Sequence, residues 1–88
     1  MTKYYLNGEL VRTSKRNDFN YIVTIDYNNC GKPSLHVTLE AATKAAAKTR
    51  NLYEKEIKEW AYKYDTTTIE YQQRIENCKV FKLEKVSA

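Results

Sequence analysis

A short basic segment near the N-terminus holds the residue types best suited to bind an anion. Three cations and two hydroxyl side chains occupy five consecutive positions: Arg12, Thr13, Ser14, Lys15 and Arg16. Arginine binds a phosphate through two parallel N–H donors, and hydroxyls add further donors beside it. The segment therefore predicts a phosphate-binding site. The alternative is a solvated loop whose charge protects a sheet edge against aggregation.

Aromatic rings lie on the strands that we expect to neighbour this segment. Tyr5, Phe19 and Tyr21 offer faces on which a base can stack, as bases do on nucleic-acid-binding sheets. Rings and cations together predict a ligand with both a base and a phosphate, which is a nucleotide or a nucleic acid. In the alternative interpretation these rings belong to the core.

A second basic group follows in the middle of the chain. Lys44 and Lys48 share one face of an expected helix, with Arg50 close by and no acidic residue between Ala41 and Tyr53. If the protein self-associates, this group can complete the phosphate site of another copy. The alternative is an ordinary row of solvated lysines.

Catalytic and metal-binding patterns are weak. Ser14, His36 and either Asp18 or Asp26 supply the residue types of a catalytic triad, but their spacing resembles no nucleophile elbow. Two separated cysteines and one histidine are too few for a structural zinc site, and no glycine-rich phosphate loop is present. We expect no catalytic residues, no metal and no cofactor.

The first half of the chain reads as antiparallel strands. Asn7-Gly8 accepts the positive φ angles of a type I′ turn and predicts a hairpin between residues 3–6 and 9–13. From Phe19 to Tyr27 apolar and polar residues alternate, which predicts a strand, and residues 35–37 supply a short returning strand. A meander of three to four strands follows from this pattern.

A long helix from Leu39 to Tyr64 is the next expected element. Thr38 is a suitable N-cap, and the apolar positions step by three or four residues to form one stripe: Ala42, Ala46, Thr49, Tyr53, Ile57, Trp60 and Tyr64. Such a helix would be ~39 Å long, longer than a domain of this size requires. Either it breaks near Arg50-Asn51 or one end projects against another subunit, and we expect a homo-oligomer.

The C-terminal segment is expected to form a β-hairpin. The threonine run at 66–68 is β-branched, residues 69–75 alternate, and a second strand from Lys79 to Val86 can pair with them. A second helix through residues 68–77 is the alternative. The fold class is thus α+β: an antiparallel meander packed on one long helix, followed by a C-terminal hairpin.

Length and composition limit the class of protein. The 88 residues suffice for a single domain, 1–88, and the net charge of +4 permits an acidic partner without requiring one. No stretch is long and apolar enough to span a membrane, and the N-terminus lacks the apolar core of a secretory signal. We expect a cytoplasmic protein.

The opening segment Tyr4 to Arg16 (YYLNGELVRTSKR), followed by an aromatic strand and one long helix, resembles the start of small phage- and prophage-encoded proteins. The resemblance covers under a third of the chain. Some proteins of that kind are similar to counter-defence factors, which include anti-CRISPR inhibitors and Thoeris anti-defence sponges that sequester cyclic nucleotides. No ligand residues of such families map onto the second half of this chain.

The leading hypothesis is therefore a non-enzymatic phage protein of the host bacterial cytoplasm that counters a defence system by binding. Its partner would be an anionic ligand, either a nucleotide or a nucleic acid, or a bacterial defence protein such as a CRISPR nuclease. Two alternatives stay open. One is a nucleic-acid-binding module that contacts phosphates through the basic clusters, and the other is a module that binds proteins only.

Overall fold

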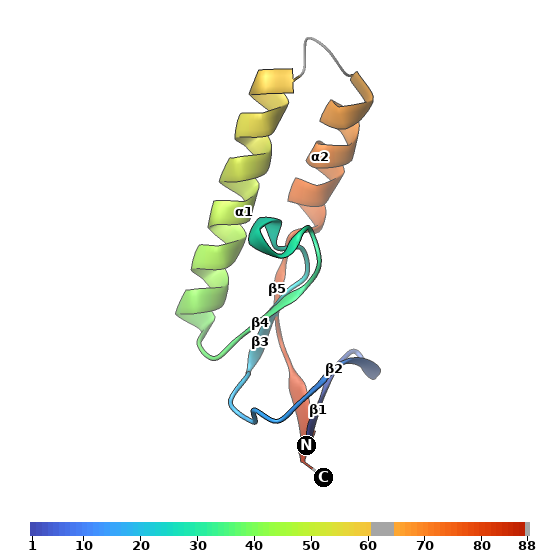
Figure 1. The fold of residues 1–88 in the computed structure, drawn as a ribbon, viewed down its shortest axis with the longest axis vertical. Helices are drawn as coiled ribbons and strands as arrows, with labels where there is room; N and C mark the ends of the chain where they lie inside the picture. The colour runs from blue at the N-terminus through green and yellow to red at the C-terminus, as the bar shows by residue number, and fades with distance from the viewer. Residues whose placement is uncertain (61–64, 88) are drawn as a thin grey trace.

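The computed structural model describes residues 1–60 and 65–87 of the chain. Two helices form an arm at one end of an elongated molecule, and two small sheets form the other end (Figure 1). The overall extents are 50 × 23 × 18 Å. In chain order the elements are β1 (Thr2–Leu6), β2 (Glu9–Ser14), β3 (Tyr21–Val23), the 3-10 helix η1 (Tyr27–Asn29), β4 (Ser34–His36), α1 (Leu39–Trp60), α2 (Asp65–Asn77), β5 (Val80–Lys82) and β6 (Glu84–Ser87).

The expected N-terminal hairpin is confirmed. Strands β1 and β2 pair antiparallel with Leu6 opposite Glu9, and the two turn residues both have positive φ, 53° at Asn7 and 81° at Gly8. That geometry is the type I′ turn, which asparagine and glycine tolerate better than other residues. Strand β6 joins the other edge of β1, so sheet A has the order β2-β1-β6.

The second sheet, sheet B, has the order β4-β3-β5 and sits between α1 and sheet A. Its central strand β3 buries both faces: Ile22 packs with Tyr4 and Leu83, whereas Val23 packs with the α1 residues Ala42 and Ala46. A strand covered on both sides has no polar face, so the single apolar face expected for residues 19–27 is wrong.

Strand β3 is also shorter than expected. It ends at Val23, and the Asp26 carboxylate accepts a hydrogen bond from the Asn28 backbone N–H at 3.0 Å, which caps η1. Two further backbone bonds, from Asn29 and Gly31 to the Asp26 carbonyl, close the turn. Local capping by an aspartate side chain overrides the β-type alternation of the sequence here.

Helix α1 begins where expected, at Leu39. The Thr38 hydroxyl accepts a hydrogen bond from the Ala41 N–H at 3.1 Å, and the expected stripe is buried at Ala42, Ala46, Thr49 and Tyr53. The helix runs unbroken through Arg50-Asn51 to Trp60, so of the two alternatives the break is absent; Tyr64 lies outside the described residues.

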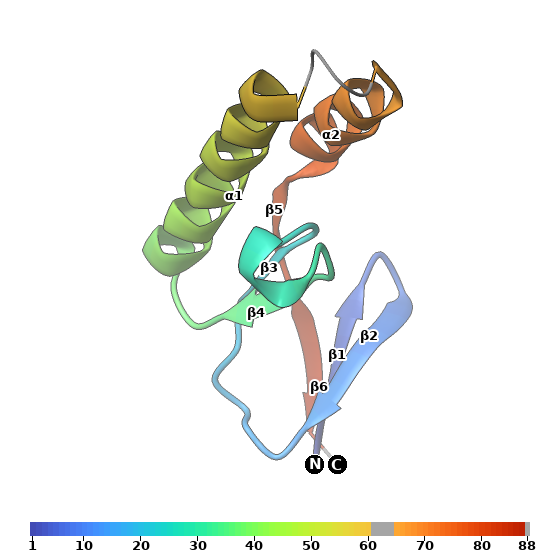
Figure 2. The same ribbon diagram turned by 45° about the horizontal axis from the view of Figure 1, so that its top comes forward.

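The C-terminal half corrects the expected hairpin. Residues 65–77 form α2, which was the alternative, and α2 packs antiparallel along α1 (Figures 1 and 2). Tyr71 and Ile75 stand one turn apart on α2, and the Tyr71 ring lies 5.1 Å from the Tyr53 ring. Packing against α1 therefore outweighs the β propensity of the threonine run.

The expected C-terminal strand is present but is divided at Leu83, and it pairs with distant strands. Strand β5 pairs with β3, and β6 pairs with β1. The α+β class, the antiparallel strands and the long helix are confirmed. Among the described residues no helix is long and apolar enough to cross a bilayer.

Candidate nucleic-acid interface

The basic segment lies at the end of β2 and in the loop that follows it. Arg12 and Thr13 are exposed on this edge strand, opposite Tyr4 and Lys3 of β1. The Ser14 hydroxyl accepts a hydrogen bond from the Arg16 backbone N–H at 3.2 Å. Arg12 and Lys15, both exposed, are the cations of this segment for which no ion pair with a described carboxylate is found.

Arg16 is engaged within its own loop. Its guanidinium makes a two-pronged ion pair with Asp18, at 2.9 and 2.7 Å, and lies 4.4 Å from the centroid of the Phe19 ring. The hydrogen bonds to Arg16 lower the pKa of the Asp18 carboxyl, and they raise the pKa of Arg16. A phosphate would have to displace Asp18, and a base would have to displace the guanidinium from Phe19.

The three rings expected to stack do not form one platform. Phe19 packs against the buried cluster of Ile22 and also meets the Tyr4 ring edge-on at 5.6 Å. Tyr21 packs against the cluster on the α1 side of sheet B. Tyr5 is half-buried on sheet A, between Leu10 and Glu84 of the neighbouring strands. The structure places these rings in three different environments.

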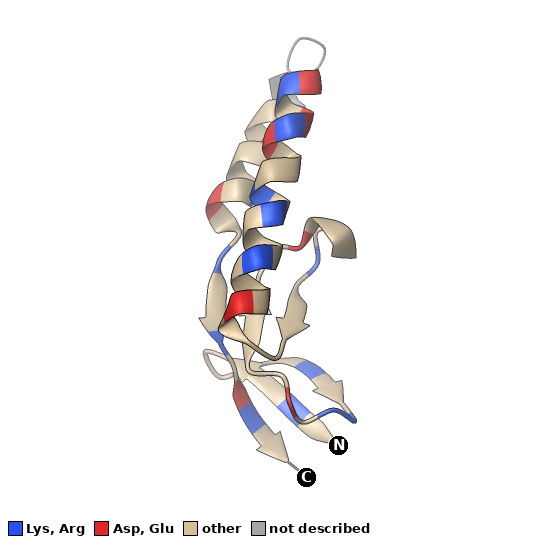
Figure 3. Cartoon of the chain, turned by 90° about the vertical axis from the view of Figure 1, so that its left-hand side faces the viewer, with Lys and Arg blue, Asp and Glu red and all other residues tan. Residues whose placement is uncertain are grey.

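The second basic group forms part of a longer lysine row on α1. Lys44 and Lys48 are exposed, and Lys55 and Lys58 continue the same face. At 100° per residue these four positions fall within an arc of about 80°, and they span ~21 Å of the helix. The row lies opposite the buried stripe, and blue segments recur along α1 in Figure 3.

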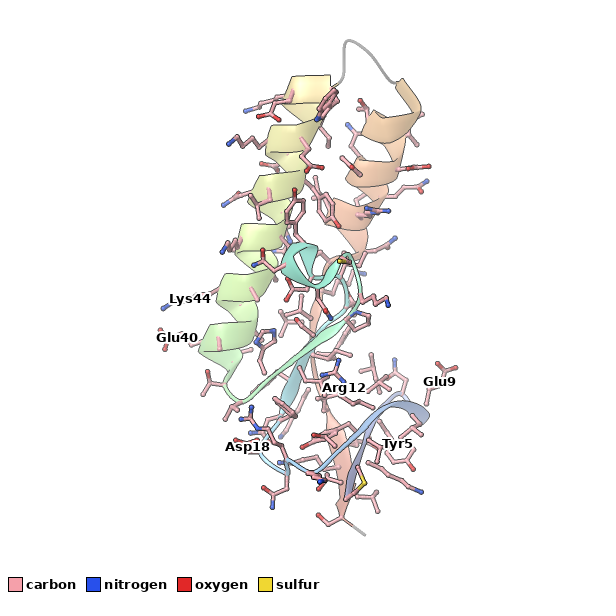
Figure 4. All side chains as sticks on the ribbon, in the orientation of Figure 1. Tyr5, Glu9, Arg12, Asp18, Glu40 and Lys44 are labelled. Atoms are coloured by element: carbon pink, nitrogen blue, oxygen red, sulfur yellow. The ribbon has the colours of Figure 1, made fainter. Side chains whose placement is uncertain are left out.

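The lysine row was only partly predicted. In the sequence Lys55 and Lys58 each have a glutamate four residues away, a pattern that predicts local ion pairs and does not by itself indicate a shared basic face. An ion pair on this face lies at the N-terminal end of α1, where Lys44 meets Glu40 at 3.2 Å with both side chains more than three-quarters exposed. Figure 4 shows both pointing away from the sheets. Such an exposed pair is weak and opens readily.

The two basic groups do not converge on one pocket. In Figures 1 and 2 the loop after β2 lies at the sheet end, below the first turn of α1, while α1, the helix that carries the lysine row, runs up the arm. Positive charge is thus distributed along the length of the molecule. This arrangement suits an extended polyanion better than a single phosphate group.

The residue types of a catalytic triad are engaged in other contacts in the described part of the chain. Asp18 is paired with Arg16, and Asp26 caps η1. His36 instead lies 2.8 Å from the Ser34 hydroxyl on β4, a contact that the two-residue spacing of a strand would have indicated. Within the same residues no cluster of three or more His, Cys, Asp or Glu side chains could hold a metal ion.

Both cysteines are free thiols. Cys30 is exposed, whereas Cys78 is buried and donates to the Ile25 carbonyl at 3.2 Å. Burial raises the pKa of the Cys78 thiol, so it stays protonated and unreactive at neutral pH. Cys78 is a core residue.

One side of the seam between α1 and α2 is filled by a cluster of tyrosines that the sequence analysis missed. The Tyr53 ring contacts the rings of Tyr27 and Tyr71, each at 5.1 Å, and the Tyr27 hydroxyl donates to the Glu56 carboxylate. The Arg74 guanidinium lies 5.6 Å from the Tyr53 centroid. We call this the closed side of the arm.

The tyrosine hydroxyls of the closed side are held in their neutral form. The hydrogen bond to Glu56 raises the pKa of Tyr27. Burial raises the pKa of Tyr71, and Glu56 adds to this shift. The cluster therefore joins η1, α1 and α2 through neutral phenols and one carboxylate, and its role is structural.

The opposite side of the same seam is an open groove of about 490 Å³. Its floor is formed by Ile57 of α1 and Ile75 of α2, both half-buried. Charged and polar side chains surround this floor: Glu54, Lys58, Gln72 and Glu76. We call this the open side of the arm.

Comparisons with protein-family models, with curated proteins and with solved structures found no match.

Proposed function

We propose that this chain is a non-enzymatic counter-defence protein that acts by binding nucleic acid. The observation that carries the proposal is the lysine row, Lys44, Lys48, Lys55 and Lys58, exposed along ~21 Å of α1 opposite its buried stripe. Four cations along one face of a rigid helix can contact several phosphates of one nucleic-acid strand.

Electrostatics supports an extended ligand. Duplex DNA carries one negative charge per about 1.7 Å of its axis, so each lysine of a ~21 Å row has a phosphate within reach. Contacts of this kind release condensed counterions and read no sequence. The expected binding is therefore salt-sensitive and largely independent of base sequence.

A single-nucleotide ligand has less support. Arg16 is already paired with Asp18 and covers one face of Phe19. Tyr21 packs on the α1 side of sheet B, and Lys44 and Lys48 project from α1. The side chains that would have to bind one base and one phosphate are thus far apart in the fold. Binding a single nucleotide would require them to move or to give up existing contacts.

Two observations support the counter-defence role. They are the lysine row and the resemblance of residues 4–16 to phage-encoded proteins. A protein that covers nucleic acid can keep a defence nuclease from its substrate, and this needs neither a catalytic residue nor a cofactor. Bacteria that carry a CRISPR nuclease and express the chain should support higher phage plating than bacteria without it. Equal plating in both strains would refute the counter-defence role while leaving nucleic-acid binding intact.

Fluorescence anisotropy with labelled single-stranded and duplex DNA tests the binding itself. We expect the logarithm of the binding constant to fall linearly with the logarithm of salt concentration, with a slope of about −3 for four phosphate contacts. Changing Lys44, Lys48 and Lys55 to Glu should weaken binding at least about tenfold at low salt and reduce the slope by about 2 to 3.

A charge-matched control separates the row from net charge. Lys32, Lys79 and Lys82 are exposed and lie outside α1, so changing these three to Glu alters net charge equally. The control should lose clearly less affinity than the row variant. Equal losses in both variants, or no binding of either DNA by the original protein at low salt, would contradict the proposal.

A further inference from the structure

We propose that the open side of the arm binds a second copy of this chain in an antiparallel, twofold-symmetric contact. The inference does not depend on nucleic-acid binding. It starts from the difference between the two sides of the α1–α2 seam: one is filled by the chain's own tyrosines, while the other exposes an apolar floor.

The apolar surface of the open side extends beyond the groove floor. Ile69 stands on α2 three residues before Gln72 and seven before Glu76, so all three share one helix face. The Ile69 side chain is 57% exposed. Ile69 thus adds an exposed aliphatic side chain beside the groove whose floor is Ile57 and Ile75, and helices bury such surfaces against other helices.

The charged residues around the groove can pair with the same residues of a second copy. Glu54 and Lys58 are one turn apart on α1 and both face the groove. A twofold axis that crosses α1 between these residues reverses the helix direction, so Glu54 of each copy meets Lys58 of the other. One symmetric contact thus forms two opposite-charge pairs around the isoleucines, as an isologous interface requires.

A parallel arrangement of the two arms fits less well. It would bring α1 of one copy over α2 of the other, and Glu54 would then face Glu76, since Arg74 and Tyr53 show that these parts of the helices lie level with each other. Facing carboxylates repel. Charge therefore selects the antiparallel pairing, in which both α1 helices meet.

The proposed dimer leaves most of the lysine row free. Lys44, Lys48 and Lys55 project from α1 away from its buried stripe, and only Lys58 belongs to both the row and the groove. Two copies would carry two lysine rows in opposite directions on one particle. A dimer would thus bind a long nucleic acid more tightly than one chain, through avidity.

Sedimentation velocity over a range of protein concentrations tests the proposal, with single and double charge reversals as the probes. Glu54→Lys alone and Lys58→Glu alone each place like charges opposite one another twice, and each should raise the dimer dissociation constant at least about tenfold. The combined variant E54K/K58E restores both pairs with reversed polarity. Its dissociation constant should return to within about threefold of the original.

Two controls keep the result interpretable. Leu10→Ser removes an exposed apolar side chain from sheet A and should leave the dimer unchanged. Circular dichroism should show the same helix content and melting behaviour for all charge variants, because both positions are exposed. A protein that stays monomeric at about 100 µM, or a double reversal that fails to restore a dimer lost in the singles, would overturn the proposal. Association through a different surface would leave both single variants dimeric, which also overturns it.

Discussion

The two sides of the α1–α2 seam use different chemistry. The closed side holds a tyrosine cluster in which the Tyr27 hydroxyl of η1 needs a specific partner, and Glu56 of α1 supplies it within the chain. The open side carries isoleucines, which any apolar surface of suitable shape can cover. The comparison teaches that the chain covers with its own residues the side that requires directed hydrogen bonds. Within the described residues it leaves open the side on which contact is non-directional.

The largest expected effect comes from removing the central ring of the closed side. Tyr53 is 2% exposed and touches rings from both η1 and α2. Tyr53→Ala should lower the free energy of unfolding by about 3–4 kcal/mol, since large-to-small changes in a core leave a cavity. Urea denaturation followed by circular dichroism measures this. Tyr5→Ala changes a half-buried residue of sheet A and is the matched control. It should lower the free energy of unfolding much less, and an equal decrease in both variants would contradict the central role of Tyr53.

Alkaline pH should loosen the closed side selectively. The folded-state pKa values of Tyr27 and Tyr71 are raised above 10.0, so the folded protein holds these protons more tightly than the unfolded chain. Their contribution to stability is therefore fully present below pH 10 and is lost as pH rises above it.

Melting temperatures measured from pH 8 to 11 test whether stability falls with rising pH in this way. Tyr27→Phe removes the titrating hydroxyl, so the stability difference between the original protein and this variant should shrink as pH rises past 10. A difference that stays constant over this range would show that the Glu56 contact does not couple to ionisation.

The smallest effect on the monomer is expected on the open side. Ile57 is half-buried in the groove, so Ile57→Ser should lower monomer stability by only about 1 kcal/mol. Denaturation at a protein concentration low enough to keep the chain monomeric measures the contribution of Ile57 to the stability of the monomer alone. A loss as large as that of Tyr53→Ala would mean that Ile57 belongs to the core of one chain.

Local signals in the sequence were reliable where a single residue type decides the geometry. Asn7-Gly8 fixed the hairpin because both positions need positive φ, and Thr38 marked the start of α1 because its hydroxyl satisfies a free backbone donor. The stripe from Ala42 to Tyr53 was likewise foreseen from its spacing. These features depend on neighbours within a few residues.

Features that depend on distant partners were not foreseen. The threonine run before Ile69 favours a strand locally, but Tyr71 gains a buried contact with Tyr53 only when residues 65–77 are helical. Both faces of β3 are covered because α1 and sheet A meet it from opposite sides. The contacts of Arg16 with Asp18 and Phe19 are local, but they depend on the conformation of the loop after β2, which no single residue type dictates.

The pairing of Thr2 with Ser87 in sheet A has a consequence for the order of folding. The β1–β2 hairpin and the α1–α2 arm close short loops, whereas β6 can reach β1 only after about 85 residues have been traversed. Closing such a loop costs about 2 kcal/mol more chain entropy than closing one of ten residues. On the ribosome, the hairpin and the arm can therefore form early, and the third strand of sheet A docks last, when it joins the two ends of the fold.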